Sequence, residues 1–132
     1  MRGFARLPPS NGVPRLKSTV QLAHRIAALA AEKLATDIVI LDMRDVVSYT
    51  DHFIICTGRT PRQTQAISDA IRESLKRDDK RAAQRVEGQA QGDWILIDYL
   101  DAVVHIFTPE AREFYRLESL WGQVPSETFA AG

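Results

Sequence analysis

The sequence has a single cysteine, Cys56, among its 132 residues, which excludes an internal disulfide and any metal site built from several cysteines. It also lacks a long hydrophobic run. Apolar runs such as residues 38–41 and 53–56 have the length of a strand, whereas a membrane-spanning helix needs about 20 apolar residues. A secretory signal, with its apolar stretch of about 7–15 residues, is missing as well. We therefore expect one soluble domain without a membrane partner in a reducing compartment, the cytoplasm or, as the minor alternative, an organellar matrix.

Sequence motifs that mark common enzyme classes are also lacking. Neither of the glycine-rich patterns that bind dinucleotides or nucleoside triphosphates occurs, and no two histidines have the spacing of a helical zinc site. Metal-dependent nucleotidyl transfer needs convergent carboxylates. The nearest pairs, Asp42 with Asp45 and Asp98 with Asp101, are three residues apart instead of the two that share a strand face. Cys56 lies in an apolar strand pattern and is predicted to be buried, not nucleophilic. The residues taken alone therefore give only weak support for an enzyme.

Charge is balanced in total, with 17 basic and 17 acidic residues, but it is unevenly distributed. Residues 1–17 carry a net charge of +4 and residues 72–85 one of +3, whereas residues 87–118 carry −5. Domains that bind duplex nucleic acid through its phosphates are usually basic. The acidic stretch fits a basic protein partner better than direct, sequence-specific binding of nucleic acid, although ordinary solvated surface charge would give the same pattern.

The hydrophobic pattern alternates between helix and strand periods over residues 18–122, which we interpret as the folded domain. Residues 1–17 are predicted to be a flexible basic arm, and residues 123–132 a short tail that frays from residue 125. The helices that begin near residues 60 and 108 each have a threonine cap followed by proline. Short turns force antiparallel neighbours, so the expected fold is α+β, a mixed β-sheet flanked by helices. The predicted helices are 18–34, 60–76 and 108–121, and the predicted strands are 38–42, 52–57, 81–86, 94–99 and 102–107.

Aromatic residues give the most unusual pattern. Strand alternation places Trp94, Leu96 and Asp98 on one face, a partly apolar row that ends in charge. Such a row is typical of a protein-recognition surface with an aromatic anchor, but a tryptophan packed under a helix of the same chain fits equally well. His105 also allows two interpretations, a half-buried strand histidine or an exposed contact. Three later residues have the spacing of a buried helical stripe: Phe114, Leu117 and Trp121.

Three blocks of the sequence resemble a known family. The first reads Thr-Asp-His-Phe-Ile-Ile-Cys-Thr-Gly over residues 50–58. The second reads Asp-Trp-Ile-Leu-Ile-Asp-Tyr over residues 93–99 and continues with Asp101 and residues 103–107. The third holds Phe114-Tyr115 and Leu120-Trp121. In their order and spacing these blocks are similar to the ribosomal silencing factors, the Iojap-like proteins, over about residues 18–122. The family usually has glycine where this chain has Leu100.

The resemblance implies a translation repressor that is not an enzyme. Family members bind the large ribosomal subunit through its protein fourteen and block joining of the small subunit, and organellar members are linked to assembly of the large subunit. Their fold is similar to that of nucleotidyltransferases without the catalytic carboxylates, so a nucleotidyltransferase-like enzyme that uses Asp98 and Asp101 is the alternative function. Members self-associate, which makes a homodimer a further expectation, and no cofactor is implied. The family's contact surface carries over to five residues: Trp94, Asp98, Asp101, His105 and Tyr115.

Overall fold

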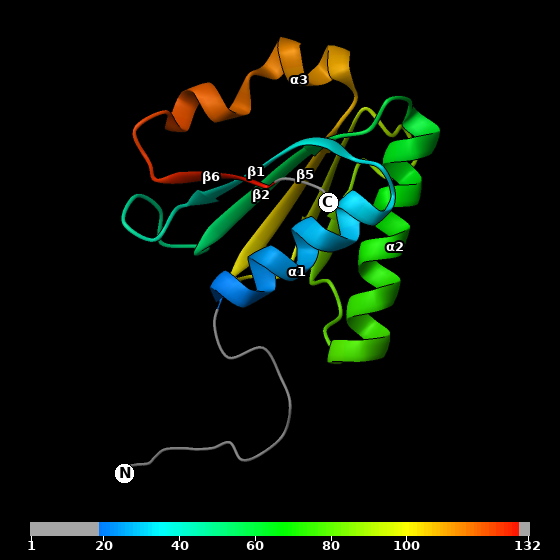
Figure 1. Ribbon diagram of the computed structural model, residues 1–132, viewed down its shortest axis with the longest axis horizontal. Coiled ribbons are helices and arrows are strands. Elements are labelled where there is room, and N and C mark those ends of the chain that lie inside the picture. Colours follow the sequence, from blue (N-terminus) through cyan, green and yellow to red (C-terminus); the bar gives the residue numbers. More distant parts are fainter. Residues whose placement is uncertain (1–18, 130–132) are drawn as a thin grey trace.

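The computed structural model describes residues 19–129, which form a six-stranded sheet with helices on both faces (Figure 1). The predicted N-terminal arm, residues 1–17, lies outside the described residues. Helices α1 and α2 cover one face, and α3 with the short 3-10 helix η1 covers the other. In chain order the elements are α1 (Thr19–Glu32), β1 (Thr36–Asp42), β2 (His52–Thr57), α2 (Pro61–Asp79), β3 (Arg85–Glu87), β4 (Trp94–Asp98), β5 (Ala102–Phe107), α3 (Pro109–Tyr115), η1 (Leu117–Trp121) and β6 (Ser126–Phe129).

The sheet is mixed, which confirms the predicted α+β class. Its strands lie in the order β3-β4-β5-β2-β1-β6. Strands β2 and β5 are parallel, and every other neighbouring pair is antiparallel. The parallel pair arises because the chain leaves β2 through α2, β3 and β4 before it returns as β5 beside β2.

Two hydrophobic clusters hold the layers together. Strand alternation sends Ile54 and Val104 toward α1 and α2, and it sends Phe53 and Phe107 toward α3 and η1. Strands β2 and β5 are buried at every residue, because helices cover both faces of these central strands. Each fully buried Val, Ile or Phe side chain of these strands contributes about 1.5–3 kcal/mol through the hydrophobic effect. The centre of the sheet is therefore a rigid support for the residues that the adjoining strand β4 presents.

Both predicted helix starts are confirmed. The Thr60 hydroxyl accepts a hydrogen bond from the Gln63 N–H at 3.2 Å, and the Gln63 side chain in turn accepts from the Arg59 N–H at 2.7 Å, one residue before the donor of a standard capping box. The Thr108 hydroxyl accepts from the Ala111 N–H at 3.3 Å. These contacts satisfy backbone donors that have no partner inside the helix, so they fix where α2 and α3 leave the sheet.

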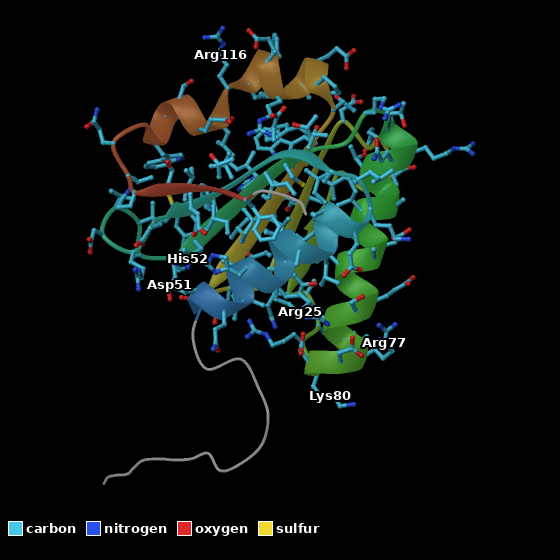
Figure 2. The ribbon with its side chains drawn as sticks, viewed as in Figure 1. Arg25, Asp51, His52, Arg77, Lys80 and Arg116 are labelled. Carbon is cyan, nitrogen blue, oxygen red and sulfur yellow. The ribbon has the colours of Figure 1, made fainter. Side chains whose placement is uncertain are left out.

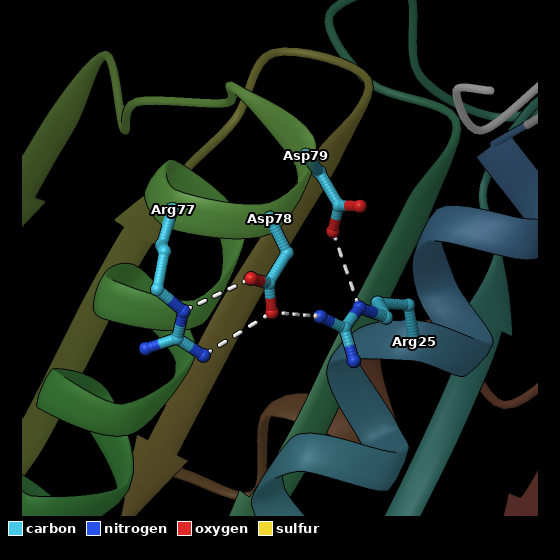
Figure 3. A network of polar contacts seen from close by, with 4 residues as sticks. All are labelled: Arg25, Arg77, Asp78 and Asp79. Atoms are coloured by element: carbon cyan, nitrogen blue, oxygen red, sulfur yellow. Dashed lines mark hydrogen bonds and ion pairs between the residues drawn. The ribbon is translucent and has the colours of Figure 1, made fainter.

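A polar network joins α1 to the end of α2 (Figure 3). Arg25 donates to Asp78 and Asp79, each at 3.1 Å, and Asp78 also accepts from Arg77 at 2.9 Å. Exposed ion pairs add less than about 1 kcal/mol each, so this network orients the two helices more than it stabilises them. Neither these two helices nor any other in residues 19–129 is long and apolar enough to cross a membrane.

The C-terminal part of the chain differs from the prediction. The last helix ends at Tyr115 because Arg116 takes a left-handed backbone conformation with φ of 48°, and residues 117–121 continue as η1. The stretch from residue 126 to 129, which was expected to fray, is strand β6 and pairs with residues 38–41 of β1. A short edge strand of this kind is fixed by the neighbour it pairs with, which its own composition does not reveal.

Two smaller differences concern the middle of the chain. Helix α2 continues to Asp79 instead of ending at residue 76, and it buries the two polar side chains of Thr64 and Ser68. Both hydroxyls are satisfied inside the protein, since Thr64 donates to the backbone oxygen of Gly92 and Ser68 contacts the Gln89 side chain at 2.7 Å. The strand predicted over residues 81–86 is shorter and lies at residues 85–87.

Candidate interaction surface

Trp94 is the first residue of β4, and its half-buried indole lies on the face of the sheet that α3 covers. It pairs with Phe107 across the β4–β5 hairpin, and the centroids of the two rings are 5.0 Å apart. Tyr115, the last residue of α3, packs on the indole at 4.7 Å. The structure thus combines both interpretations of Trp94, because the ring packs against α3 and still keeps part of its surface exposed.

His105 lies inside the sheet layer next to Trp94. Only 4% of its surface is exposed, so the interpretation of His105 as an exposed contact is wrong. The indole Nε1–H of Trp94 donates to His105 Nδ1 at 3.1 Å. Burial lowers the pKa of His105 to about 4, and the imidazole is therefore neutral near pH 7.

The end of α3 adds two exposed aromatic rings beside Trp94. Phe114 is 79% exposed and Tyr115 49% exposed, and the two rings meet edge to face with centroids 5.0 Å apart. The prediction that Phe114 belongs to a buried stripe is wrong, because α3 has only seven residues and buries only Ala111. The spacing of hydrophobic residues does not indicate that the helix ends before Arg116. We call Trp94, Phe114 and Tyr115 the aromatic surface.

Acidic residues border the aromatic surface. Phe114 and Tyr115 line one side of a hollow of about 540 Å³, and Asp93 and Glu110 also line it. Both carboxylates are exposed, and neither forms an ion pair with a cation of residues 19–129. An unpaired carboxylate next to an exposed ring suits a Lys or Arg side chain of a partner, which can satisfy both.

The structure places Asp98 and Asp101 away from this surface, at the far end of the β4–β5 hairpin. Strand geometry separates Asp98 from Trp94 by about 13 Å. The Asp98 carboxylate accepts from the Leu100 N–H at 2.8 Å, and Asp101 accepts from Arg81 at 2.7 Å. These contacts shape the turn, and each carboxylate is already engaged within the chain. Of the five residues carried over from the family, the structure brings together Trp94, His105 and Tyr115.

Other parts of the described chain do not assemble a catalytic site. Burial raises the pKa of the Cys56 thiol to about 12, so it is not a nucleophile at neutral pH. Within residues 19–129 no group of three or more histidine, cysteine, aspartate or glutamate side chains could hold a metal ion. Ionisable side chains are instead spread over the molecule. Figure 2 shows Arg116 on the α3 side, whereas Asp51 and His52 lie near the start of α1.

The fold and the surface together define a class of protein: a small α+β domain whose aromatic surface, with an acidic border, has the composition of a protein-binding site. The chain belongs to the ribosomal silencing factor family, since the family model described as "Ribosomal silencing factor during starvation" matches residues 16–131. This confirms the resemblance that the three sequence blocks indicated.

Individual relatives agree with this assignment. The ribosomal silencing factor of Bacillus subtilis is 38% identical over 111 residues, which cover 83% of this chain and 89% of the relative. A Mus musculus protein named "Mitochondrial assembly of ribosomal large subunit protein 1" is 31% identical over 98 residues, 73% of this chain and 43% of the mouse protein. A crystal structure of a protein from Bacillus halodurans has a TM-score of 0.69 and 33% identity, and the match covers 84% of this chain and 97% of that chain.

Proposed function

We propose that this protein represses translation by binding the large ribosomal subunit through ribosomal protein fourteen of that subunit. Bound there, it would occupy the face where the small subunit docks, and repression would follow from steric occlusion without catalysis or a cofactor. Membership of the silencing factor family supports this function. The name of the mouse relative supports a second consequence of the same binding event, an aid to assembly of the large subunit. We place this activity in the cytoplasm.

The aromatic surface is the observation that carries the proposal. Binding energy at protein interfaces is concentrated in a few residues, among which tryptophan and tyrosine are enriched. Trp94 and Tyr115 are supported by the rigid sheet and by α3, so little conformational freedom is lost when a partner covers them. Ribosomal proteins are generally basic, and the unpaired carboxylates of Asp93 and Glu110 would speed and orient the encounter.

Co-sedimentation with isolated ribosomal subunits tests the proposal. The purified protein should pellet with the large subunit and not with the small one, and it should reduce the yield of joined ribosomes when small subunits are added afterwards. Binding should weaken between about 50 and 200 mM salt, because charge complementarity is screened. Pelleting with neither subunit, or an unchanged yield of joined ribosomes, would contradict the proposal.

A substitution in the aromatic surface tests the site itself. Trp94→Ala should weaken binding to the large subunit by about 2 kcal/mol or more, close to 30-fold, as expected for an interface anchor. Tyr49→Ala is the matched control, because Tyr49 is also an exposed aromatic residue but belongs to the β1–β2 loop at the other end of the sheet. Equal losses for the two variants would show that the aromatic surface is not the contact site.

The exposed rings of the aromatic surface also support a homodimer in the free protein, since a second copy would shield them from water. Light scattering at several protein concentrations should then give a molar mass that rises toward twice 14.8 kDa. A mass that stays at the monomer value up to the highest concentration would exclude the dimer.

A further inference from the structure

The hydrogen bond between Trp94 and His105 fixes the tautomer of the histidine. An indole Nε1–H can only donate, so His105 Nδ1, which lies 3.1 Å from it, must carry no proton and accepts the bond. The imidazole proton then resides on Nε2, which has no hydrogen-bond partner among residues 19–129. Among residues 19–129, Trp94 is therefore the single hydrogen-bond partner of the His105 ring, which also packs against Phe53 and Phe107.

The position of the His105 ring is set by three adjacent strands. His105 lies in the middle of β5, opposite Leu96 of β4 and Ile55 of β2. Phe53 packs edge to face on the imidazole with centroids 4.8 Å apart, and Phe107 stacks near it at 6.4 Å. Because these neighbours lie in the buried centre of the sheet, His105 Nδ1 is a fixed acceptor next to the half-exposed indole.

We infer that His105 is a positioning residue for the aromatic surface: it holds the Trp94 indole in the orientation in which the ring meets the ribosomal partner. The inference rests on the proposed function. It identifies His105 as the buried group that fixes Trp94, the proposed main anchor, before the partner binds. Tyr115 and Phe107 restrain the faces of the indole, whereas His105 fixes its rotation by holding the N–H. Without this acceptor the indole would lose its fixed rotation, and its N–H would be left without its buried partner.

The acceptor must stay neutral for this role. A protonated imidazole would present an N–H toward the indole N–H, and the bond would be lost. The rings packed around His105 belong to Phe53, Trp94 and Phe107, all uncharged, and no carboxylate among them favours the protonated form. Burial lowers the pKa of His105 accordingly, to about 4. The orientation of Trp94 is thus maintained throughout the neutral range.

Two substitutions of His105 separate positioning from packing. His105→Asn retains an acceptor oxygen close to the position of Nδ1, whereas His105→Leu fills a similar space without any acceptor. We expect His105→Leu to weaken binding to the large subunit by about five- to tenfold and His105→Asn to restore most of this loss. Should His105→Leu fail to fold, His105→Gln replaces it. The amide group of glutamine lies nearer the position of Nε2, so it offers no acceptor at the position of Nδ1, and binding should be weakened as for His105→Leu.

A double-mutant cycle shows whether His105 acts through Trp94. Trp94→Phe keeps a ring but removes the N–H, so in this background His105→Leu should cause no further loss of affinity. A loss of the same size with and without Trp94→Phe would overturn the inference, because His105 would then act through packing alone. Thermal unfolding of all four proteins monitors the stability of the core separately.

A measurement on the free protein makes the inference independent of the ribosome. The indole N–H of Trp94, assigned by its absence in Trp94→Phe, should exchange slowly with solvent in the wild type and in His105→Asn and much faster in His105→Leu. Equal exchange in all three would overturn the inference. If the exchange rates follow the expectation but no protein pellets with the large subunit, the proposed function fails and with it the role of His105 in binding, whereas the orientation of Trp94 by His105 stands.

Discussion

Arg112 of α3 and Glu118 of η1 form an ion pair at 2.7 Å across the left-handed residue Arg116, where the last helix breaks. The same guanidinium donates to the backbone oxygen of Asp37 at 2.6 Å and to the Thr57 hydroxyl at 2.7 Å. Arg112 therefore connects both halves of the broken helix to β1 and β2. Because α3 carries Phe114 and Tyr115, this connection also supports the aromatic surface.

Replacing Arg112 should destabilise the protein strongly. Its side chain is only 13% exposed, and Arg112→Met would leave Glu118, the Asp37 carbonyl and the Thr57 hydroxyl without their donor. We expect the free energy of unfolding to fall by about 2–3 kcal/mol. Urea unfolding of the variant measures the loss. Arg116→Met is the matched control, because Arg116 is exposed and, within residues 19–129, its side chain pairs only with Glu113, and it should change stability by less than about 0.5 kcal/mol. Equal effects would show that Arg112 has no special role.

The turn between β4 and β5 contains a residue that is poorly suited to its backbone conformation. Leu100 has φ of 74° and a side chain that is 57% exposed, so it bears the steric cost of the left-handed region without a compensating core contact. Leu100→Gly should raise the free energy of unfolding by about 0.5–1 kcal/mol. Val46→Gly, at an exposed position without a positive φ, should have no stabilising effect. A gain for Val46→Gly equal to that for Leu100→Gly would contradict this explanation.

Most of the fold could be predicted from the sequence because the responsible signals are local. Threonine followed by proline marks the start of α2 and α3, and short runs of apolar and β-branched residues mark β2, β4 and β5. The break at Arg116 and the pairing of β6 with β1 could not be predicted. The break depends on the bonds that Arg112 makes to residues far away in the chain, and the pairing of β6 depends on the edge of β1, which is likewise distant in the sequence.

The candidate site was predicted only in part, for the same reason. The alternation in β4 correctly separates the outward Trp94 from the buried Ile95, and the family resemblance adds Tyr115. Phe114 was assigned to the core because its spacing continues a helical stripe that the real helix does not continue. The sequence left open whether His105 is exposed. Strand alternation gives the face of the sheet on which a side chain lies, but it does not give what covers that face.

The stabilisation that β6 gains from its contact with α1 should depend on pH. Glu127 of β6 contacts His24 of α1 at 2.9 Å, and this hydrogen bond raises the pKa of His24 above its usual 6.5. A raised pKa in the folded state means that the stabilisation is complete below pH 6.5 and disappears as the pH rises through the elevated pKa. Since both side chains are substantially exposed, the effect should stay below about 1 kcal/mol.

Glu127→Gln therefore should lower the free energy of unfolding at pH 6 and have little effect at pH 9, as measured by urea unfolding at both values. Glu87→Gln is the control, because Glu87 pairs with Arg85, whose charge does not change over this range. Its effect should be the same at both pH values. A Glu127→Gln effect that does not shrink at pH 9 would show that His24 is not the titrating partner.

A substitution of Phe114 separates an effect on binding from an effect on stability. Its ring is 79% exposed and contacts little beyond Tyr115 within the described chain, so Phe114→Ser should leave the urea midpoint almost unchanged. If the aromatic surface is the contact site, the same substitution removes an apolar ring from the interface and should weaken binding to the large subunit by about 1–2 kcal/mol. Leu34→Ser, at a position that is 72% exposed in the turn after α1, is the control that should affect neither quantity. Full binding by Phe114→Ser would restrict the contact to Trp94 and Tyr115. A lowered urea midpoint would instead mean that the ring stabilises α3, and the loss of binding could then not be assigned to the surface.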